Sequence, residues 1–526
     1  MQKCLAYGDY MAVKADLKAG KKEWAGLAIL VLPMLLLSMD NSLLYLVLPH
    51  MSAALHANST EQLWMMDIYG FMIAGFLVTM GTLADRIGRR KLLLIGAAIF
   101  GAASIIAAFS QTAGVVIVMR ALLGIAGATL MPSTLGLVRV MFRDSKQLGV
   151  AVGALVSCFM AGTVLGPLLG GLLLQYFWWG SVFLLGVPIM VLLLILGPLF
   201  LPEYRDAASK VKVDPASVLL SLAAILPMIY GLKELVQNGW QPISILAVVA
   251  SPIFGVAFVG RQKKLASPLL DLGLFKKRAF SAALSIGILT GLVMGGTFLF
   301  ATMYLQLVVG LSALNAGLWL IPQAIAMISV SLIIPHLTHR IRPAYVIAAA
   351  LLVAIVGLLI LTQVKAGGGL ETLIVGLVVV AIGIAPPTVL STSLILSSAP
   401  PEKAGAAGSL SETSGQLGLA LGIALLGSLG TFVYRAFVTH ALSSALPAAV
   451  SAAAKDTLTN ALATTTNLSI QLKDAVVPPA REAFTDGLHA VVFAGAVLLL
   501  GLAVIVILTL RQVKLGSGDE VEPQPS

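Results

Sequence analysis

Charged residues are scarce in this chain. Asp, Glu, Lys and Arg make up 11% of its 526 residues, whereas about 25% is usual for a soluble protein. Apolar residues make up 59% and gather in runs of the roughly 20 residues that a membrane-spanning helix needs. This composition excludes an ordinary soluble domain and predicts an all-α integral membrane protein. The net charge of +10 then requires no nucleic acid, because basic residues collect on the cytoplasmic loops of membrane proteins.

Catalytic and metal-binding signatures are missing as well. Cys4 and Cys158 are the two cysteines, too few for a disulfide framework or a cysteine metal site. No G-x-x-x-x-G-K-[ST] sequence occurs, so an ATP-driven pump is not expected. Neither a cluster of metal ligands nor a nucleophile with a neighbouring base stands out in the sequence. We therefore expect no enzyme, no cofactor and no metal.

The apolar runs predict fourteen membrane spans with both termini in the cytoplasm. Most of the 33 Lys and Arg residues then fall on cytoplasmic segments, as the positive-inside rule requires. Five lysines precede the first run, which favours a retained anchor over a cleaved signal peptide. The predicted spans are 24–49, 63–82, 92–109, 115–132, 148–174, 181–201, 216–236, 243–260, 280–309, 313–335, 345–364, 370–397, 404–437 and 487–510.

The loop 81–91, GTLADRIGRRK, organises this topology. Four closely spaced cations beside a span favour a cytoplasmic loop, and Gly81 and Gly88 allow the backbone to come close at the two helix ends. A weaker copy, HLTHRIR at 336–342, follows the tenth span. It indicates an internal duplication, which is how many secondary transporters are built.

The duplication predicts two six-helix halves with two further spans between them, because the second loop follows span ten and not span eight. The expected parts are a cytoplasmic tail at 1–23, a first bundle at 24–201, two additional spans with a basic connector at 202–279, a second bundle at 280–510 and a cytoplasmic tail at 511–526. The outer loop 440–486 is expected either to form two amphipathic helices or to be disordered.

Ionisable residues inside spans cost about 2.5–3.5 kcal/mol to insert and are functional candidates for that reason. Asp40 in the first span and Arg120 in the fourth lie at a similar depth, roughly 10–12 Å from the outer end at 1.5 Å per residue. They are expected to pair. A carboxylate beside an arginine resists protonation until the pair opens, which suits a proton site; a static pair that orders two helices is the alternative.

Two more in-span carboxylates are candidates for binding a cation. Trp64 and Asp67 are three residues apart and share a helical face near the outer mouth of span two, where a ring and a carboxylate can meet an organic cation. The alternative is an interfacial tryptophan beside a hydrated aspartate. Glu412 lies among Ser, Thr and Gln416, which indicates a hydrated cavity wall, with a structural hydrogen bond as the plain alternative.

A stripe of small residues marks the fifth span. Gly162, Gly166 and Gly170 recur every four residues in the sequence GTVLGPLLGG, which Pro167 interrupts. Such a stripe favours close helix packing.

These motifs resemble the major facilitator superfamily over about residues 25–510. The loop 81–90 resembles its signature between spans two and three, and RALLG, beginning at Arg120, its span-four motif. The glycine motif 162–171 is similar to the span-five motif of its exporters. Asp40, together with Leu48 and Pro49 near the end of the same span, is similar to the first span of fourteen-span drug–proton antiporters.

Three shorter stretches narrow the resemblance to the QacA and SmvA group, which exports quaternary ammonium compounds, viologens, biguanides and dyes. They are LWMMDIY at 63–69, YFWWGSVF at 176–183 and EKAGAAG at 402–408. The sequence departs from the group at Asn41, which follows Asp40 directly, and at Gly186, where asparagine is frequent. It also departs at Gln416, which stands where the group has a carboxylate. A span-ten aspartate of some dication exporters has no counterpart, so divalent substrates are less expected than monovalent ones.

The resemblance implies two pseudo-symmetric bundles that rock around a midplane cavity, with protons as the coupling ion. It assigns proton coupling to Asp40 and Arg120, and substrate binding to Asp67 and Glu412, to which we add Trp64 and Gln416. The residues implied in conformational gating are Gly81, Asp85, Arg86, Gly88 and Arg89. Those of the antiporter motif are Gly162, Gly166, Pro167, Gly170 and Gly171.

The function expected is proton-coupled export of lipophilic cations across the cytoplasmic membrane by a monomer in contact with lipid. One alternative is a dedicated exporter of a single natural product, such as an antibiotic against which the cell protects itself. The other is a membrane sensor or scaffold that transports nothing, in which case the two in-span carboxylates would have no purpose.

Overall fold

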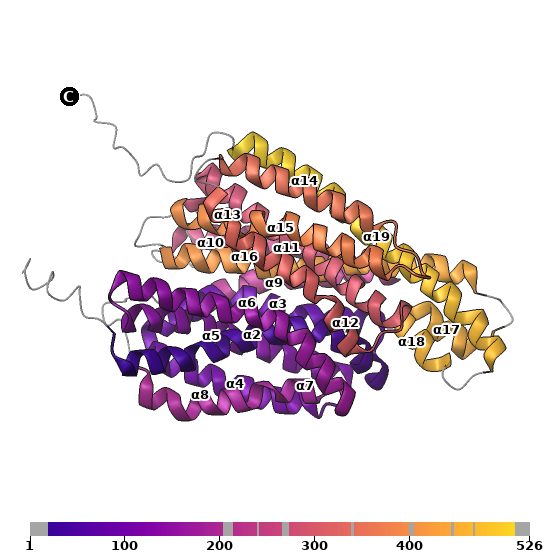
Figure 1. The fold of residues 1–526 in the computed structure, drawn as a ribbon, viewed down its shortest axis with the longest axis horizontal. Coiled ribbons are helices and arrows are strands. Elements are labelled where there is room, and N and C mark those ends of the chain that lie inside the picture. Colours follow the sequence, from indigo (N-terminus) through magenta and orange to yellow (C-terminus); the bar gives the residue numbers. More distant parts are fainter. Residues whose placement is uncertain are drawn as a thin grey trace, which may run out of the picture.

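The computed structural model describes residues 19–203, 214–238, 241–265, 273–337, 341–398, 404–442, 446–465 and 469–510. Within these ranges the regular structure is helical, without a strand. Figure 1 shows two layers of roughly parallel helices, one formed by the first part of the chain and one by the last. The expected all-α architecture is confirmed.

The first layer contains the helices that we call the N-half. They are α2 (Lys21–Leu55), α3 (Ser59–Ile87), α4 (Arg89–Ala108), α5 (Ala113–Met141), α6 (Ser145–Tyr176), α7 (Ser181–Leu184) and α8 (Gly186–Phe200). Two helices follow, α9 (Pro215–Asn238) and α10 (Pro242–Lys264), and they pack along each other. Helix α9 also contacts both α3 and α16.

The second layer, the C-half, follows a short turn of helix η1 (Leu274–Lys276). Its elements are α11 (Arg278–Met303), the π-helical segment η2 (Tyr304–Val308), α12 (Ala313–Trp319), α13 (Ile321–Leu337), α14 (Pro343–Leu361), α15 (Leu370–Ser398), α16 (Ala404–Ala441), α17 (Ala448–Asp456), α18 (Leu458–Thr465) and α19 (Ile470–Leu510).

Local sequence explains where several helices begin. Asn58 accepts a hydrogen bond from the backbone N–H of Glu61, whose carboxylate accepts one from Asn58 N–H in return. This capping box fixes the start of α3. Thr112 and Asp144 cap α5 and α6 in the simpler way, each accepting from the N–H three residues on, which satisfies backbone donors that the helix leaves free.

Twelve helical stretches among the described residues are long and apolar enough to span a membrane. They include α2, α4, α5 and α6 in the N-half and α14, α15, α16 and α19 in the C-half. Helices α3 and α9, where two further spans are expected, are 29 and 24 residues long, and α9 contains a shorter apolar stretch, Ala216–Met228.

The segment 440–486 was expected either to form two amphipathic helices or to be disordered. It contains the two short helices α17 and α18, as the helical alternative predicted. Its last part is not loop, because α19 starts at Ile470 and continues through Pro478 and Pro479 to Leu510. The span predicted at 487–510 is the last part of this helix, which also runs through the end of the predicted loop.

The two ends of the bundle are distinct. Leu55, the start of α3 and the α17–α18 pair lie at one end, which we call the hairpin end. The start of α2 and Gly88 lie at the other, which we call the Gly88 end. The two halves are packed together by α3 against α16 and by α6 against α12.

Candidate functional site

Asp40 and Arg120 form an ion pair inside the N-half. Arg120 Nη1, on α5, lies 2.6 Å from Asp40 Oδ2, on α2. Arg120 is fully buried and Asp40 is 6% exposed, so the expected pairing is confirmed. In such surroundings the removal of either partner leaves an uncompensated buried charge, which is far more costly than the loss of a surface pair.

Tyr69 of α3 holds Arg120 from a second side. The guanidinium carbon lies 4.3 Å from the centre of the Tyr69 ring, an arrangement that stabilises a cation. Arg120 Nε donates to the carbonyl oxygen of Met65 at 3.3 Å, and Nη2 has no hydrogen-bond partner among the described residues. Gly124 permits this contact, because a Cβ there would collide with the carbonyl oxygen of Tyr69.

Asp67 is buried in the same part of the N-half. It is 1% exposed, and Tyr45 lies within electrostatic reach of both Asp67 and Arg120. Trp64 is half-buried and packs beside a small cluster around Phe71. Neither Asp67 nor Trp64 belongs to the wall of the pocket described next. The sequence places Asp67 toward the outer end of span two, and the structure shows that surrounding protein encloses its side chain there.

A small pocket lies between the halves beside the buried ion pair. Gln416 Nε2 donates to Glu412 Oε1 at 3.0 Å within α16, and Asn41 Nδ2 of α2 donates across to Gln416 Oε1 at 3.4 Å. Glu412 and Gln416 therefore lie on a cavity wall, as the sequence indicated. The residues that line the pocket are Leu37, Asn41, Tyr69, Ile73, Leu77, Gly127, Met131, Phe159, Glu412 and Gln416.

The sequence analysis assigned no site role to Asn41 or Tyr69. Asn41 follows Asp40 directly and bonds to the C-half, while Tyr69 touches Arg120 with its ring and borders the pocket. Each therefore connects the buried ion pair with the pocket. The available signal was that Tyr69 ends the LWMMDIY stretch and that Asn41 departs from the related sequences.

Arg90 holds the turn at Gly88. Gly88 has a φ of +108°, a conformation that favours glycine, and a Cβ there would collide with the Glu203 carboxylate. Arg90 Nε lies 3.3 Å from Glu203 Oε2, and Arg90 Nη1 donates to the Leu201 carbonyl at 2.9 Å. This ties the start of α4 to the end of α8.

The other predicted gating residues are placed less uniformly. Arg89 Nη1 donates to the Pro132 carbonyl at 3.1 Å, and a Cβ on Gly136 would collide with this guanidinium. Arg86 is exposed, and the side chain of Asp85 lies outside the described part of the structure. At Gly81 an added Cβ would make an ordinary contact with Pro132. The close approach expected at Gly81 is therefore absent, because α5 stays at normal packing distance there.

The glycine motif of α6 packs two surfaces closely. A Cβ on Gly162 or Gly166 would collide with the backbone of α2, and one on Gly170 would press against Leu43. The expected stripe is therefore confirmed. Gly171 turns to the other half, because a Cβ there would collide with Leu314 of α12. Pro167 contributes its carbonyl to the same contact, against Gly317 of α12.

Comparison with known proteins identifies the family of this fold. The family model described as Major Facilitator Superfamily matches residues 30–423. The chain belongs to the major facilitator superfamily. Solved structures agree at the level of the fold: a bacterial homologue of the human lysosomal transporter Spinster has a TM-score of 0.65 at 15% identity, covering 94% of this chain and 98% of that one.

Similar sequences are named for efflux and resistance. The chain is 36% identical to the multidrug efflux pump LfrA of Mycolicibacterium smegmatis, over 93% of this chain and 97% of that protein. It is 31% identical to the methyl viologen resistance protein SmvA of Salmonella typhimurium, over 91% and 97%. The tetracenomycin C resistance and export protein of Streptomyces glaucescens is 30% identical, over 78% of this chain and 76% of that protein.

Proposed function

We propose that this chain is a proton-driven multidrug efflux antiporter that exports lipophilic cations across the cytoplasmic membrane. The observation that carries the proposal is a pocket between the two halves with a carboxylate in its wall and a buried ion pair beside it. The similarity to an efflux pump and a viologen resistance protein over more than 90% of the chain supports export and a cationic substrate.

The walls of the pocket favour a monovalent organic cation. Tyr69 and Phe159 supply aromatic rings and Met131 an adaptable apolar surface, which suit the flat or bulky apolar groups around a quaternary nitrogen. Glu412 is the acidic residue of the pocket wall, and Gln416 beside it is neutral. One carboxylate balances one positive charge, so a substrate with two widely separated charges is bound less well.

Asp40 is the proton-carrying group in this proposal. Asp40 is buried and bonded directly to Arg120, so a proton can bind it only when this pair opens. When Asp40 is protonated, its attraction for Arg120 is lost. Tyr69 carries that change to the pocket because its ring contacts Arg120, and Asn41 carries it because it adjoins Asp40 and bonds to Gln416.

The topology that fits this function has fourteen spans arranged as six, two and six. Helices α3 and α9 provide the two spans beyond the twelve apolar ones, since each is long enough to cross about 30 Å of hydrocarbon. The Gly88 end faces the cytoplasm, because the basic loop 81–91 lies there. Both termini then lie inside and the hairpin end lies outside. The protein acts as a monomer, with protons as the coupling ion and without a further cofactor.

Transport into proteoliposomes tests the proposal. With an imposed pH gradient, we expect the wild-type protein to accumulate tetraphenylphosphonium, and we expect Asp40→Asn to lose the dependence on the gradient. Thr439→Ala is a suitable control, because Thr439 is exposed and bonds within its own helix. The proposal would be overturned if the folded, inserted wild-type protein took up no cation, either with or without the pH gradient.

A dedicated exporter of one natural product is the second candidate. The similarity to the tetracenomycin C export protein favours it, although that match is weaker and covers less of both chains. This alternative predicts tight binding of one compound and no competition between unrelated cations. Competition of tetraphenylphosphonium uptake by several chemically unrelated cations therefore separates the two.

A further inference from the structure

Tyr45 lies on the face of α2 that meets the C-half. It follows Asn41 by four residues, so the two side chains project from the same side of the helix. Asn41 bonds to Gln416 of α16. The Tyr45 ring packs edge-on against Phe298 of α11, with the ring centres 4.9 Å apart and the planes at 80°. Since Asp40 precedes Asn41 directly, one segment of α2 carries the buried carboxylate and two separate contacts with the C-half.

The hydroxyl of Tyr45 is a buried polar group without a hydrogen bond. The residue is 4% exposed, and its hydroxyl oxygen has no hydrogen-bond partner among the residues that the structure describes. Leaving a hydroxyl unpaired inside a protein is costly, so each case requires an explanation. A hydroxyl of this kind is accounted for when its partner arrives in another state of the protein.

Arg120 is the group best suited to be that partner. Among the charges that act on the Tyr45 hydroxyl, that of Arg120 has the largest effect, followed by that of Asp67. Arg120 Nη2 also has no hydrogen-bond partner among the described residues. A donor and an acceptor, both buried and both without a hydrogen bond, therefore lie in the same part of the N-half.

The other contacts of Arg120 leave its Nη2 without an acceptor. Nε donates to the Met65 carbonyl at 3.3 Å, and Tyr69 presents the face of its ring to the guanidinium, with the ring centre 4.3 Å away. The hydroxyl of Tyr69 lies at the far edge of that ring, toward Gly127 of α5. Tyr69 therefore stabilises the cation through its ring and is poorly placed to accept a hydrogen bond from it.

Protonation of Asp40 leaves Arg120 without its anion. A buried guanidinium that lacks acceptors is strongly disfavoured, so the pair opens more easily when another acceptor takes the place of Asp40. A tyrosine hydroxyl has lone pairs that accept such a bond without taking up a proton itself. The hydroxyl of Tyr45 supplies this acceptor.

We propose that Tyr45 is a positioning residue for proton coupling: its hydroxyl accepts a hydrogen bond from Arg120 when Asp40 takes up a proton, and its ring passes the change to the C-half through Phe298. This inference rests on the proposed function, in which Asp40 carries the proton. The proton stays on Asp40, and Tyr45 neither gains nor loses one. Asn41 and Tyr45 then connect the same carboxylate to α16 and to α11, one helical turn apart.

Few other groups affect a pH dependence at this place. Helices α6, α11 and α12 meet this part of α2 with the uncharged residues Gly162, Phe298 and Gly317. Among the described residues, the charged or titratable side chains that act on Tyr45 or Asp40 are Arg120 of α5 and Asp67 and Tyr69 of α3.

Infrared spectroscopy of the purified, full-length protein tests the first part and needs no transported substrate. The band of the protonated Asp40 carboxyl is identified by its loss in Asp40→Asn, and its intensity is followed against pH. Tyr45→Phe retains the ring and its contact with Phe298 but removes the acceptor for Arg120. Because the protonated state then lacks a hydrogen bond, we expect the midpoint to move to lower pH by about one unit, a tenfold loss of proton affinity.

Tyr345→Phe is the matched control, because Tyr345 of α14 is 51% exposed. Its midpoint should equal that of the wild type. A purely structural role of Tyr45 predicts no shift, since the phenylalanine variant then loses only an unpaired hydroxyl. An unchanged midpoint in Tyr45→Phe would overturn the inference and leave the proposed function intact. If no Asp40 band titrated even in the wild type, both would be overturned.

The second test follows the two halves. Spin labels are attached to Gln111→Cys and Thr439→Cys, exposed positions of the N-half and the C-half near the hairpin end, after both native cysteines are changed to serine. In this parent protein the distance between the labels should change over the pH range in which Asp40 titrates. Tyr45→Phe should shift this change to lower pH together with the infrared midpoint.

Phe298→Leu separates the ring contact from the hydroxyl. It should leave the infrared midpoint in place, because the hydroxyl of Tyr45 is retained, and should reduce the pH-dependent change in distance. An undiminished change in Phe298→Leu, or no change in the parent protein, would contradict transmission to the C-half through this ring.

Discussion

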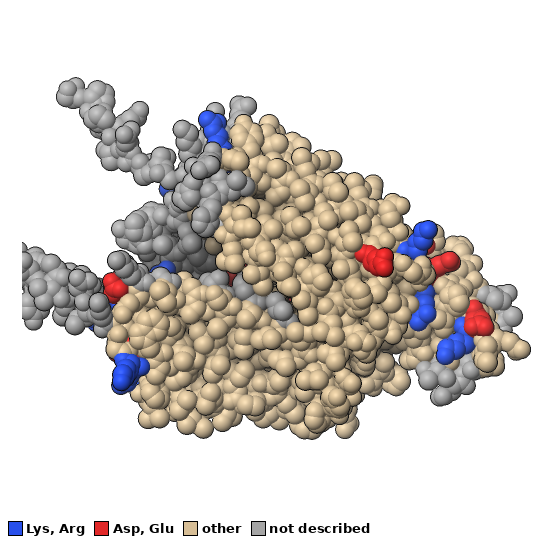
Figure 2. All heavy atoms as spheres, in the orientation of Figure 1, with Lys and Arg blue, Asp and Glu red and all other residues tan. Residues whose placement is uncertain are grey.

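Two ion pairs in this protein have the same N–O distance and very different surroundings. Asp40–Arg120 and Arg435–Asp456 both measure 2.6 Å. The Arg120 side chain is fully buried, whereas both partners of the second pair are about one quarter exposed. In Figure 2 cationic and anionic side chains are visible at the hairpin end, over the α17–α18 region, while most of the face in view is uncharged.

The difference shows that burial, and not geometry, determines what an ion pair contributes. The buried pair resists opening because each ion would face a medium that solvates it poorly. A change in the protonation state of this pair therefore alters the electrostatic environment of the residues around it. The members of the exposed pair exchange each other for water at little cost, so the pair contributes little to stability.

The largest effect is expected for Arg120→Ala, which leaves Asp40 buried without its partner. Removal of one member of a buried pair costs about 3–5 kcal/mol, so the unfolding temperature in detergent should fall clearly. Arg120→Lys should keep more of the stability but lose the stacking on Tyr69 and the bond to Met65, and with them transport. A stable Arg120→Ala variant with normal uptake would remove the contrast between the two pairs.

For Glu412→Gln we expect a smaller effect, which is limited to the affinity for cationic substrates. Glutamine keeps the size of the side chain but removes the charge of the pocket wall, so binding of a monovalent cation should weaken by about tenfold, equal to 1.4 kcal/mol. A neutral apolar ligand should bind as before. Fluorescence titration with a cationic dye and with an uncharged analogue measures this, and equal losses for both ligands would contradict an electrostatic role.

For the exposed pair we expect a slight and salt-dependent effect on stability. Asp456→Asn should change the free energy of unfolding by about 0–1 kcal/mol, and the change should shrink when salt screens the charges. Unfolding temperatures of Asp456→Asn and the wild type at low and high ionic strength measure it. A destabilisation as large as that of Arg120→Ala would show that exposure does not distinguish the pairs.

The smallest effect on stability is expected for a third ion pair, Asp214–Arg261, and this effect should depend on pH. Arg261 Nε and Nη2 donate to both carboxylate oxygens of Asp214 at 2.7 and 2.8 Å, joining the ends of α9 and α10. These bonds, more than any other contact, hold the pKa of Asp214 well below its usual range. Because the folded pKa lies below the unfolded one, the stabilisation is present above the ordinary pKa and is lost as the pH falls through the folded value.

The stability difference between the wild type and Asp214→Asn should therefore be small near neutral pH and should disappear in acid. Urea or thermal unfolding in detergent over a pH series measures it. A difference that grows as the pH falls would have the wrong sign for this pair.

Several features of the site followed from the sequence because one-dimensional spacing determines them. The depth of Asp40 and Arg120 along their helices predicted their pairing, and the four-residue recurrence of Gly162, Gly166 and Gly170 predicted one packing face. Glu412 among small polar residues predicted a cavity wall. In each case the regular rise and rotation of a helix convert sequence distance into position.

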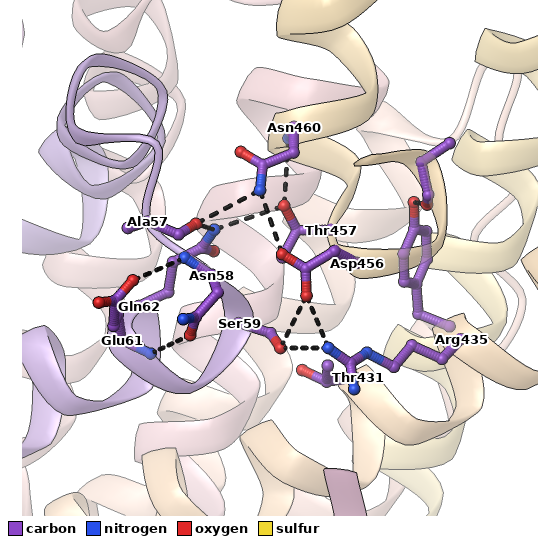
Figure 3. Close-up of polar contacts among 12 residues, drawn as sticks. Ala57, Asn58, Ser59, Glu61, Gln62, Thr431, Arg435, Asp456, Thr457 and Asn460 are labelled. Carbon is purple, nitrogen blue, oxygen red and sulfur yellow. Dashed lines mark hydrogen bonds and ion pairs between the residues drawn. The ribbon is translucent and has the colours of Figure 1, made fainter. Parts of the chain in front are cut away.

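Other features depend on which helices become neighbours, and spacing alone does not provide that. The burial of Asp67 depends on which helices pack around α3. The contact of Tyr69 with Arg120 requires the close approach at Gly124. The contact of Arg435 and Asp456 with Ser59 (Figure 3) joins positions that are 376 and 397 residues apart in the chain. The early start of α19 was missed because hydropathy marks only the apolar part of the helix, and the residues from Ile470 onward are more polar.

Proton release on substrate binding tests the central claim, that the pocket of Glu412 is coupled to the pair of Asp40 and Arg120. Purified protein in weakly buffered detergent is mixed with tetraphenylphosphonium, and an indicator dye reports the protons released. We predict release from the wild type and binding without release for Asp40→Asn. Equal release from both proteins would place the coupling proton elsewhere and contradict the account.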